Sequence, residues 1–106
     1  MKYMLLVCTD VTGEGADLDV EPWVQDLDAR GIRLMGERLR PASDATTIRV
    51  RGGEVLLSDG PFAETKEQIA GFDILECKDL DEAIEVAASH PMARNGQIEV
   101  RPFWTE

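Results

Sequence analysis

One short segment, residues 59–67, carries most of the side chains in this chain that could do chemistry together. It reads Asp-Gly-Pro-Phe-Ala-Glu-Thr-Lys-Glu and lies between two apolar runs. A tight hairpin turn needs only two residues such as Asp-Gly, so this connection is longer and more charged than a turn requires. Loops that hold several charged side chains on a rigid scaffold are where binding and catalysis usually occur. The segment is therefore the first candidate for a functional site.

Two residues of this loop are candidates for catalysis. Asp59 follows a predicted strand, and a partly desolvated carboxylate there can act as a general base. The alternative is turn chemistry, in which Asp59 hydrogen-bonds the backbone two residues on. Lys66 could hold a substrate carboxylate or stabilise an enolate. It could equally be a solvated lysine paired with a neighbouring glutamate, which contributes little.

Four residues are candidates for substrate binding. Arg40 and Arg101 could each clamp an anion with two hydrogen bonds, or form an ion pair at the surface. Phe62 could wall a pocket or belong to the core. Glu64 is a candidate for substrate binding. Glu64 and Glu67 could instead bind a metal ion, but a short acidic loop without histidine is too little evidence to predict a metal site.

Three other titratable residues lie outside the loop. His90 is the only histidine. It is expected to cap the C-terminal end of a helix, where the helix dipole favours a positive charge, rather than to take part in catalysis. Glu37 and Asp73 each lie within a predicted strand. A buried, unpaired charge is costly, so each is expected either to face water or to line a pocket.

Composition excludes several classes of protein. The 106 residues carry 11 basic and 21 acidic side chains, a formal charge of −10. That charge opposes binding to nucleic acid and to anionic membranes. No Gly-rich phosphate loop or zinc-ligand spacing occurs, so we expect no cofactor and no metal. Cys8 and Cys77 are expected to be buried free thiols, and with no signal-like or membrane-spanning segment the protein is expected to be cytoplasmic.

Hydrophobic periodicity predicts a single α+β domain over residues 1–106. Strands are expected at residues 2–8, 32–38, 46–51, 54–58, 71–77 and 97–101, and helices at about residues 19–30 and from Asp79 to Pro91. This order is the split β-α-β plan of the ferredoxin-like fold with an inserted hairpin. Strand 2–8 is apolar on both sides, whereas two helices cover only one face of a sheet. We therefore expect a homodimer with two sheets face to face.

Each predicted helix is expected to bury one apolar stripe. The first stripe comprises Val20, Trp23, Val24 and Leu27, and the second comprises Leu80, Ala83, Ile84 and Ala87. Asp79 and Glu82 have the spacing of a capping box at the start of the second helix.

Several motifs together resemble a known family. They are the N-terminal Met-Lys-Tyr-Met-Leu-Leu, Arg40-Pro41, residues 46–50, the loop at 59–67, residues 79–83 and residues 99–102. These are similar to the DGPF family of the YCII-related proteins. The resemblance implies a dimeric α+β barrel, a His–Asp pair as the suspected site, lyase or isomerase chemistry on a small molecule, and a stress-linked role. Family members often carry a histidine early in the first helix; residues 19–23 here contain none.

Two functions follow from these observations. The first is a cofactor-independent lyase or isomerase that acts on a small carbonyl or aromatic compound, with Asp59 moving a proton and Lys66 or Arg40 holding the developing negative charge. The second is a non-catalytic homodimer that binds a metabolite or serves as a stress-regulatory module. The absent helical histidine favours the second function, and the dense charge of residues 59–67 favours the first.

Overall fold

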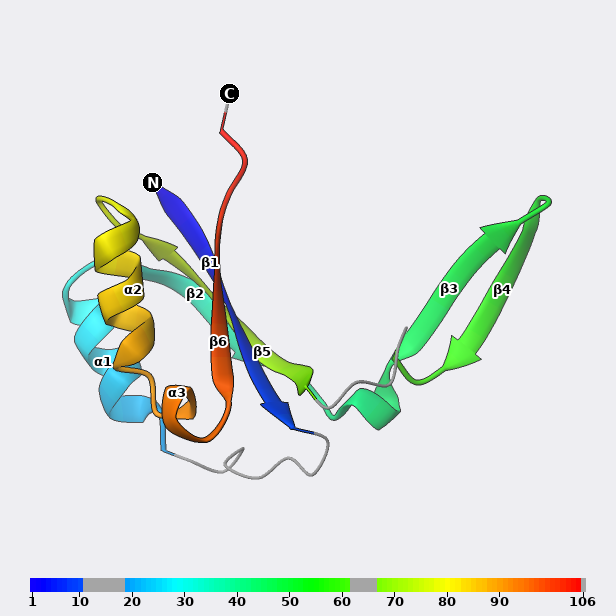
Figure 1. The fold of residues 1–106 in the computed structure, drawn as a ribbon, viewed down its shortest axis with the longest axis horizontal. Helices are drawn as coiled ribbons and strands as arrows, with labels where there is room; N and C mark the ends of the chain where they lie inside the picture. The colour runs from blue at the N-terminus through cyan, green and yellow to red at the C-terminus, as the bar shows by residue number, and fades with distance from the viewer. Residues whose placement is uncertain (11–18, 62–66, 106) are drawn as a thin grey trace.

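The computed structural model describes residues 1–10, 19–61 and 67–105, and it confirms the α+β class. A four-stranded antiparallel sheet has the strand order β2-β5-β1-β6, and its helices lie on one face (Figure 1). The elements are β1 (Lys2–Asp10), α1 (Glu21–Ala29), β2 (Arg33–Arg38), the 3-10 turn η1 (Ala42–Asp44), β3 (Thr46–Arg51), β4 (Glu54–Asp59), β5 (Glu67–Glu76), α2 (Leu80–Ala88), α3 (Met92–Asn95) and β6 (Gln97–Pro102).

The largest differences from the sequence prediction are an earlier start of β5 and an additional short helix, α3. Strand β5 begins at Glu67 instead of Gly71, because β1 also runs on past an irregularity at Val7/Cys8 and pairs with this extra length. Glycine inside a strand usually weakens it, which hid the continuation. A Cβ at Gly71 would lie 2.9 Å from the carbonyl oxygen of Glu37, so this glycine lets β2 and β5 approach closely. Helix α3 was not predicted, because one turn after a proline carries almost no periodic signal.

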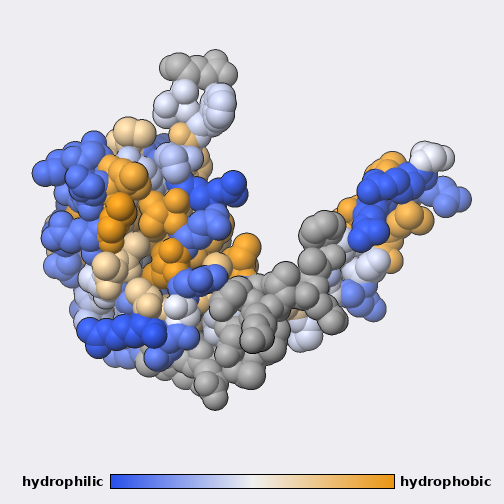
Figure 2. All heavy atoms as spheres, viewed as in Figure 1, coloured by the Kyte–Doolittle hydropathy of each residue, from blue (hydrophilic) through white to orange (hydrophobic). Residues whose placement is uncertain are grey.

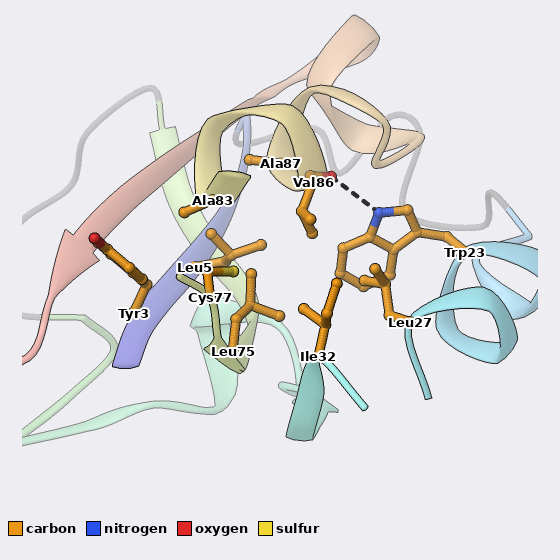
Figure 3. Close-up of a cluster of buried hydrophobic side chains, with 10 residues drawn as sticks. All are labelled: Tyr3, Leu5, Trp23, Leu27, Ile32, Leu75, Cys77, Ala83, Val86 and Ala87. Atoms are coloured by element: carbon orange, nitrogen blue, oxygen red, sulfur yellow. Dashed lines mark hydrogen bonds between the residues drawn. The ribbon is translucent and has the colours of Figure 1, made fainter. Parts of the chain in front are cut away.

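The core lies between the sheet and the helices (Figure 3). Strand β1 sends Tyr3, Leu5 and Val7 toward the helices, and all three are buried. Trp23 and Leu27 of α1 are also buried, as the predicted stripe requires. Tyr3, Leu5 and Leu75 thus pack with both helices in one cluster.

The predicted stripe on α2 is confirmed at Ala83 and Ala87 and wrong at Leu80 and Ile84. Leu80 and Ile84 are about half exposed, whereas Ala83, Val86 and Ala87 are buried. Small alanines facing the sheet let α2 approach closely, and this advantage outweighs the burial of larger side chains at the edge of the stripe. The indole N–H of Trp23 donates to the carbonyl oxygen of Val86 at 3.1 Å (Figure 3), so α1 and α2 are joined by a buried hydrogen bond.

The capping residue predicted for α2 is confirmed. The Asp79 carboxylate accepts from the Glu82 N–H at 2.9 Å, and the Glu82 carboxylate accepts from the Lys78 N–H at 3.0 Å. The first bond satisfies an N–H group that a helix start leaves without an intrahelical partner, and the second ties the residue before the cap to the first turn of α2.

Replacing this cap should cost measurable stability. Asp79→Ala is expected to lower the free energy of unfolding by about 1 kcal/mol and the Tm by about 4–8 °C. Thermal unfolding followed by circular dichroism measures the change. Asp81→Ala is the matched control, since it removes an acid from the same turn but no capping bond. An equal loss in both variants would contradict the role given to Asp79.

The β3–β4 hairpin stands apart from the rest of the protein, on the side of the sheet opposite the helices (Figure 1). Its register, from Thr46↔Asp59 to Arg51↔Glu54, agrees with the predicted hairpin. Gly52 and Gly53 close the turn with φ values of 57° and 80°. Positive φ at both central residues is the requirement of the two-residue turn that matches strand twist, and glycine meets it without strain.

The two cysteines are free, as predicted; Cys77 is buried, whereas Cys8 is only partly buried. Among the residues that the structure describes, no helix is long and apolar enough to cross a membrane. No group of three or more potential metal-binding side chains comes together within those same ranges.

Candidate functional site

A cavity of about 380 Å³ lies between α1 and the sheet. Its walls come from β1, α1, β2, β5 and the connection from α2 into α3. Four side chains give it chemical character: Trp23 from α1, Arg33 from β2, Asp73 from β5, and His90. A concave, largely apolar site with a few convergent polar groups is the usual form of a small-molecule site.

Arg33 and Asp73 form a buried ion pair in this cavity. The Arg33 Nε–H donates to Oδ1 of Asp73 at 2.8 Å, and the two side chains are only 16% and 8% exposed. Burial raises the pKa of the Asp73 carboxyl above its usual value; the hydrogen bond and charge of Arg33 lower it in part, and the Asp28 carboxylate raises it further. Asp28 also lies 3.8 Å from the Arg33 guanidinium. Asp73 is therefore a carboxylate that holds a proton more readily than one in water.

Gly36 makes room for this pair. It lies opposite Asp73 in the β2–β5 register. A Cβ at Gly36 would overlap Oδ1 of Asp73 and would lie 2.8 Å from the carbonyl oxygen of Phe72. The absence of a side chain at this position thus lets the Asp73 carboxylate turn toward Arg33.

Gly36→Ala is therefore expected to displace the Asp73 carboxylate and to destabilise the protein by about 1–3 kcal/mol, the usual cost of overpacking. Urea denaturation gives the free energy, and the carboxyl ¹³C shift of Asp73 reports its changed environment. Combining Gly36→Ala with Asp73→Ala should restore part of the loss, because the clashing atom is gone. The explanation would be contradicted if adding Gly36→Ala to Asp73→Ala lowered the free energy of unfolding by as much as Gly36→Ala does in the wild-type protein.

His90 lines the same cavity, but not in the state predicted from the sequence. The ring is 5% exposed, and its Nδ1 accepts a hydrogen bond from the Met92 N–H at 2.9 Å. Burial lowers the pKa of His90 to about 4. The expected charged cap at the end of α2 is therefore wrong: the neutral ring caps the start of α3, because a buried site excludes the charge. With Nδ1 as acceptor, the ring proton is on Nε2, which is a hydrogen-bond donor.

Trp23 holds His90 in place. The two rings meet edge to face, with centroids 4.5 Å apart and planes at 66°. The indole N–H is bonded to Val86 and to the hydroxyl of Ser89, at 3.1 Å in each case, so the tryptophan is itself fixed. His90 is thereby positioned by a ring contact on one side and a backbone N–H on the other.

None of the residues predicted for catalysis or substrate binding that the structure describes lines the cavity. Phe62, Glu64 and Lys66 lie outside the described residues. Asp59 is exposed at the end of β4, in the hairpin, and is not among the residues that line the cavity. Its catalytic role stays a prediction.

The two arginines predicted to bind substrate are exposed and form ion pairs. Arg40 pairs with Asp44 at 3.1 Å, and Arg101 pairs with Glu99 at 3.3 Å. Neither lines the cavity. Arg101 lies opposite Met4 in the β6–β1 register, on the sheet face away from the helices. Surface pairs of this kind are the alternative that the sequence left open for both.

Part of the actual cavity could be read from the sequence. A charge in the middle of a strand marked Asp73 and Glu37 as residues that face water or line a pocket. Asp73 is a buried member of the cavity, whereas Glu37 is exposed at its edge. No sequence signal connected Asp73 with Arg33, 40 residues away, or with the histidine.

Comparison with known proteins gives a consistent result. The model of the YCII-related domain matches residues 1–105. An uncharacterised protein from Rhizobium meliloti (strain 1021) is 48% identical over 68 residues, which cover 62% of this chain and 55% of that protein. The match thus spans about half the length of this curated relative. Because the family model covers nearly all of the residues, the chain belongs to the YCII-related family.

Proposed function

We propose that this protein binds a small carbonyl or aromatic compound in the cavity between α1 and the sheet and catalyses a lyase- or isomerase-type proton transfer without a cofactor. The observation that carries the proposal is the meeting of Arg33, Asp73 and neutral His90 in one cavity of about 380 Å³. This proposal assigns the catalytic roles to these buried groups, whereas the sequence-based hypothesis assigned them to the loop at residues 59–67. The strand order also supports the ferredoxin-like plan, and the cytoplasm remains the proposed location.

Asp73 has the properties of a general base. Its raised pKa brings it closer to neutral pH, where proton abstraction is most effective. In the proposed step, Asp73 takes a proton from a carbon next to a carbonyl group. The electron pair of the broken C–H bond moves into the adjacent C–C bond, and the carbonyl becomes an enolate. Return of the proton to the enolate oxygen completes a keto–enol isomerisation; in a substrate with a C=C bond conjugated to the enolate, its return to the γ carbon shifts the double bond.

His90 and Arg33 supply the stabilisation that the enolate needs. Because the pKa of His90 is about 4, its ring is neutral at pH 7, and the Nε2–H can donate a hydrogen bond to the enolate oxygen. Arg33 brings a positive charge into a site where burial strengthens electrostatic interactions. Trp23 provides an aromatic wall for an apolar part of the substrate.

Hydrogen–deuterium exchange at carbon tests the proposal whatever the final product is. Phenylpyruvate in D₂O is the probe, and ¹H NMR follows loss of the signal from the carbon next to the carbonyl. Wild-type protein should accelerate exchange above the buffer rate. Asp73→Asn should remove the acceleration, and His90→Asn should reduce it by about 10²-fold, the usual effect of one enolate donor.

Asp59→Asn, measured beside them, tests the carboxylate favoured by the sequence. Each variant is first checked for native circular dichroism. Full exchange in Asp73→Asn would exclude Asp73 as the base, and loss of exchange in Asp59→Asn alone would return the function to the hairpin.

The second candidate is a non-catalytic metabolite-binding protein. One specific observation favours it: Oδ1 of Asp73 is already engaged by Arg33 at 2.8 Å, and Nδ1 of His90 by the Met92 N–H. Groups held in this way suit recognition of a ligand as well as proton transfer. Perturbation of the His90 ring signals by phenylpyruvate, with no exchange at carbon, would favour binding alone.

A further inference from the structure

The outer end of the Arg33 guanidinium is available to a ligand. Its Nε–H donates to Asp73 at 2.8 Å, whereas Nη1 lies 3.8 Å from Oδ1 of Asp28, too far for a hydrogen bond. Among the residues that the structure describes, none accepts a hydrogen bond from Nη1 or Nη2. Every buried side-chain nitrogen or oxygen in those ranges does have a partner, so Nη1 and Nη2 must be accessible.

Gly36 places this accessible end at the cavity wall. A Cβ at Gly36 would lie 2.5 Å from Nη2 of Arg33, so the guanidinium lies directly against the glycine backbone. Both residues line the cavity. A guanidinium presents its N–H groups as a planar fork. Because Asp73 engages only Nε, the side of the fork formed by Nη1 and Nη2 remains for another acceptor.

Two further features of the cavity define what such a ligand carries. Nδ1 of His90 accepts from the Met92 N–H, and Nε2 has no hydrogen-bond partner in the described part of the chain, so by the same reasoning its N–H is accessible. Val20, Trp23 and Val24 form an apolar wall on the α1 side. The volume of about 380 Å³ lies at the lower end of the roughly 300–1,000 Å³ of small-molecule sites. The ligand is therefore small, with acceptor oxygens and an apolar tail.

The remaining charges around the cavity limit how many acid groups a ligand carries. Glu21 and Glu37 line the cavity and are exposed, and the chain has a net charge of −10. These carboxylates repel a second acid group. Arg38 also lines the cavity, but it is exposed to water, which weakens its attraction for an anion. Arg33 is only 16% exposed, so water screens its interaction with one carboxylate much less.

We propose that the cavity binds a small monocarboxylate with an apolar tail, and that Nη1 and Nη2 of Arg33 hold its carboxylate. Two parallel N–H···O bonds between a guanidinium and a carboxylate combine strength with a fixed orientation. The reactive member of this class is a 2-oxo acid, and this part of the proposal rests on the proposed function. In a 2-oxo acid the ketone adjoins the carboxylate, so the ligand brings a carbonyl oxygen for His90 and an acidic C–H for Asp73 into the same cavity.

Two unreactive ligands of nearly the same shape test the Arg33 contact without any chemistry. 3-Phenylpropanoate carries the carboxylate and an aromatic tail but no ketone, and 3-phenylpropanamide replaces the carboxylate by a neutral amide. Wild-type protein at pH 7 should bind the acid with a dissociation constant at least about 10-fold lower, as expected for a hydrogen-bonded charge pair. Isothermal titration calorimetry measures both constants. Equal dissociation constants would overturn the proposal.

The place of binding needs its own measurement, because hydrophobic residues are also exposed outside the cavity. Figure 2 shows them over α2 and along the β3–β4 hairpin, and Leu80 and Ile84 of α2 are about half exposed. The indole ¹H–¹⁵N signal of Trp23, which lines the cavity, should shift when 3-phenylpropanoate is added. The signal of Trp104, which is 90% exposed and does not line the cavity, should stay in place. A shift of the Trp104 signal alone would place the acid on the surface and overturn the proposal.

Arg33→Lys separates the fork from the charge. Lysine keeps a positive charge beside Asp73, so native circular dichroism is expected, but one ammonium cannot replace the paired N–H groups of a guanidinium. The dissociation constants of the acid and the amide should then become nearly equal. Arg38→Lys is the matched control, since it makes the same change at the exposed arginine of the cavity and should keep the preference for the acid. An undiminished preference in Arg33→Lys, or its loss in Arg38→Lys alone, would overturn the role of Arg33.

Hydrogen–deuterium exchange separates this proposal from the proposed function. Phenylacetone has the tail and the ketone of phenylpyruvate but no carboxylate. A preference for 3-phenylpropanoate without accelerated exchange of phenylpyruvate would support the Arg33 contact and remove the proton transfer. Exchange of phenylpyruvate and phenylacetone accelerated equally, each relative to its own buffer rate, would keep the proton transfer and overturn the Arg33 contact.

Discussion

Lowering the pH from 7 to 4.5 is expected to remove about 2–3 kcal/mol of stability through His90 alone. In the folded protein, burial lowers the pKa of His90 to about 4, against an ordinary value of 6.5. In the unfolded chain the ring is free to take up a proton near pH 6.5. Between these two values the unfolded state binds more protons than the folded state, so stability falls as the pH falls.

The other groups in the cavity act differently over the same range. Asp73 has a raised pKa, so its carboxylate takes up a proton more readily in the folded protein than in the unfolded chain. Protonation at low pH therefore removes part of the free-energy cost of burying its charge. A loss of stability that begins near pH 6.5 as the pH falls is typical of a histidine, and His90 is the only histidine in the chain.

His90→Asn isolates this contribution, because asparagine can accept the Met92 N–H but cannot become charged in this range. The variant should be less stable than wild type at pH 7, since it loses the ring contact with Trp23. The difference in the free energy of unfolding between wild type and variant should be about 2–3 kcal/mol smaller at pH 4.5 than at pH 7. Urea denaturation at half-unit steps measures both profiles. Parallel profiles from pH 7 to 4.5 would show that His90 is not buried in its neutral form.

Local patterns in the sequence predicted the parts of the fold that local interactions determine. The hairpin follows from alternation in β3 and from Gly52-Gly53, whose positive φ values other residues rarely adopt. The α1 stripe at Trp23 and Leu27 follows from helical spacing. The side-chain bond from Asp79 to the start of α2 also depends only on nearby residues. In each case the partners lie within a few positions of one another.

The cavity with Arg33 and Asp73 depends on contacts between residues that are far apart in the sequence, and no local pattern encodes such contacts. Asp73 meets Arg33 only because β2 and β5 are neighbours in the sheet and share a particular register. The run of charges along residues 59–67 drew attention instead to a loop, yet its last residue, Glu67, belongs to β5. A dense run of charges is typical of a surface, whereas this cavity is built from separated polar groups on rigid elements.

The second large effect is expected at the Arg33–Asp73 pair. Asp73→Ala should lower the free energy of unfolding by about 3 kcal/mol, because it leaves a guanidinium that is only 16% exposed without its main partner. Asp28, 3.8 Å from the same guanidinium, should keep the loss at the lower end of the range for broken buried pairs. Urea denaturation at pH 7 measures the change.

Replacing both charges tells whether the pair serves stability or the site. Arg33→Met with Asp73→Leu fills similar volume without a charge, and such replacements are often neutral or stabilising. A double variant as stable as wild type would show that the fold does not need the ion pair; its retention in the cavity would then be explained by a ligand. A double variant as unstable as Asp73→Ala would make the pair a structural element and weaken the case for Asp73 as a base. The raised pKa of Asp73 favours the first outcome, because burial already penalises its charged form more than Arg33 compensates.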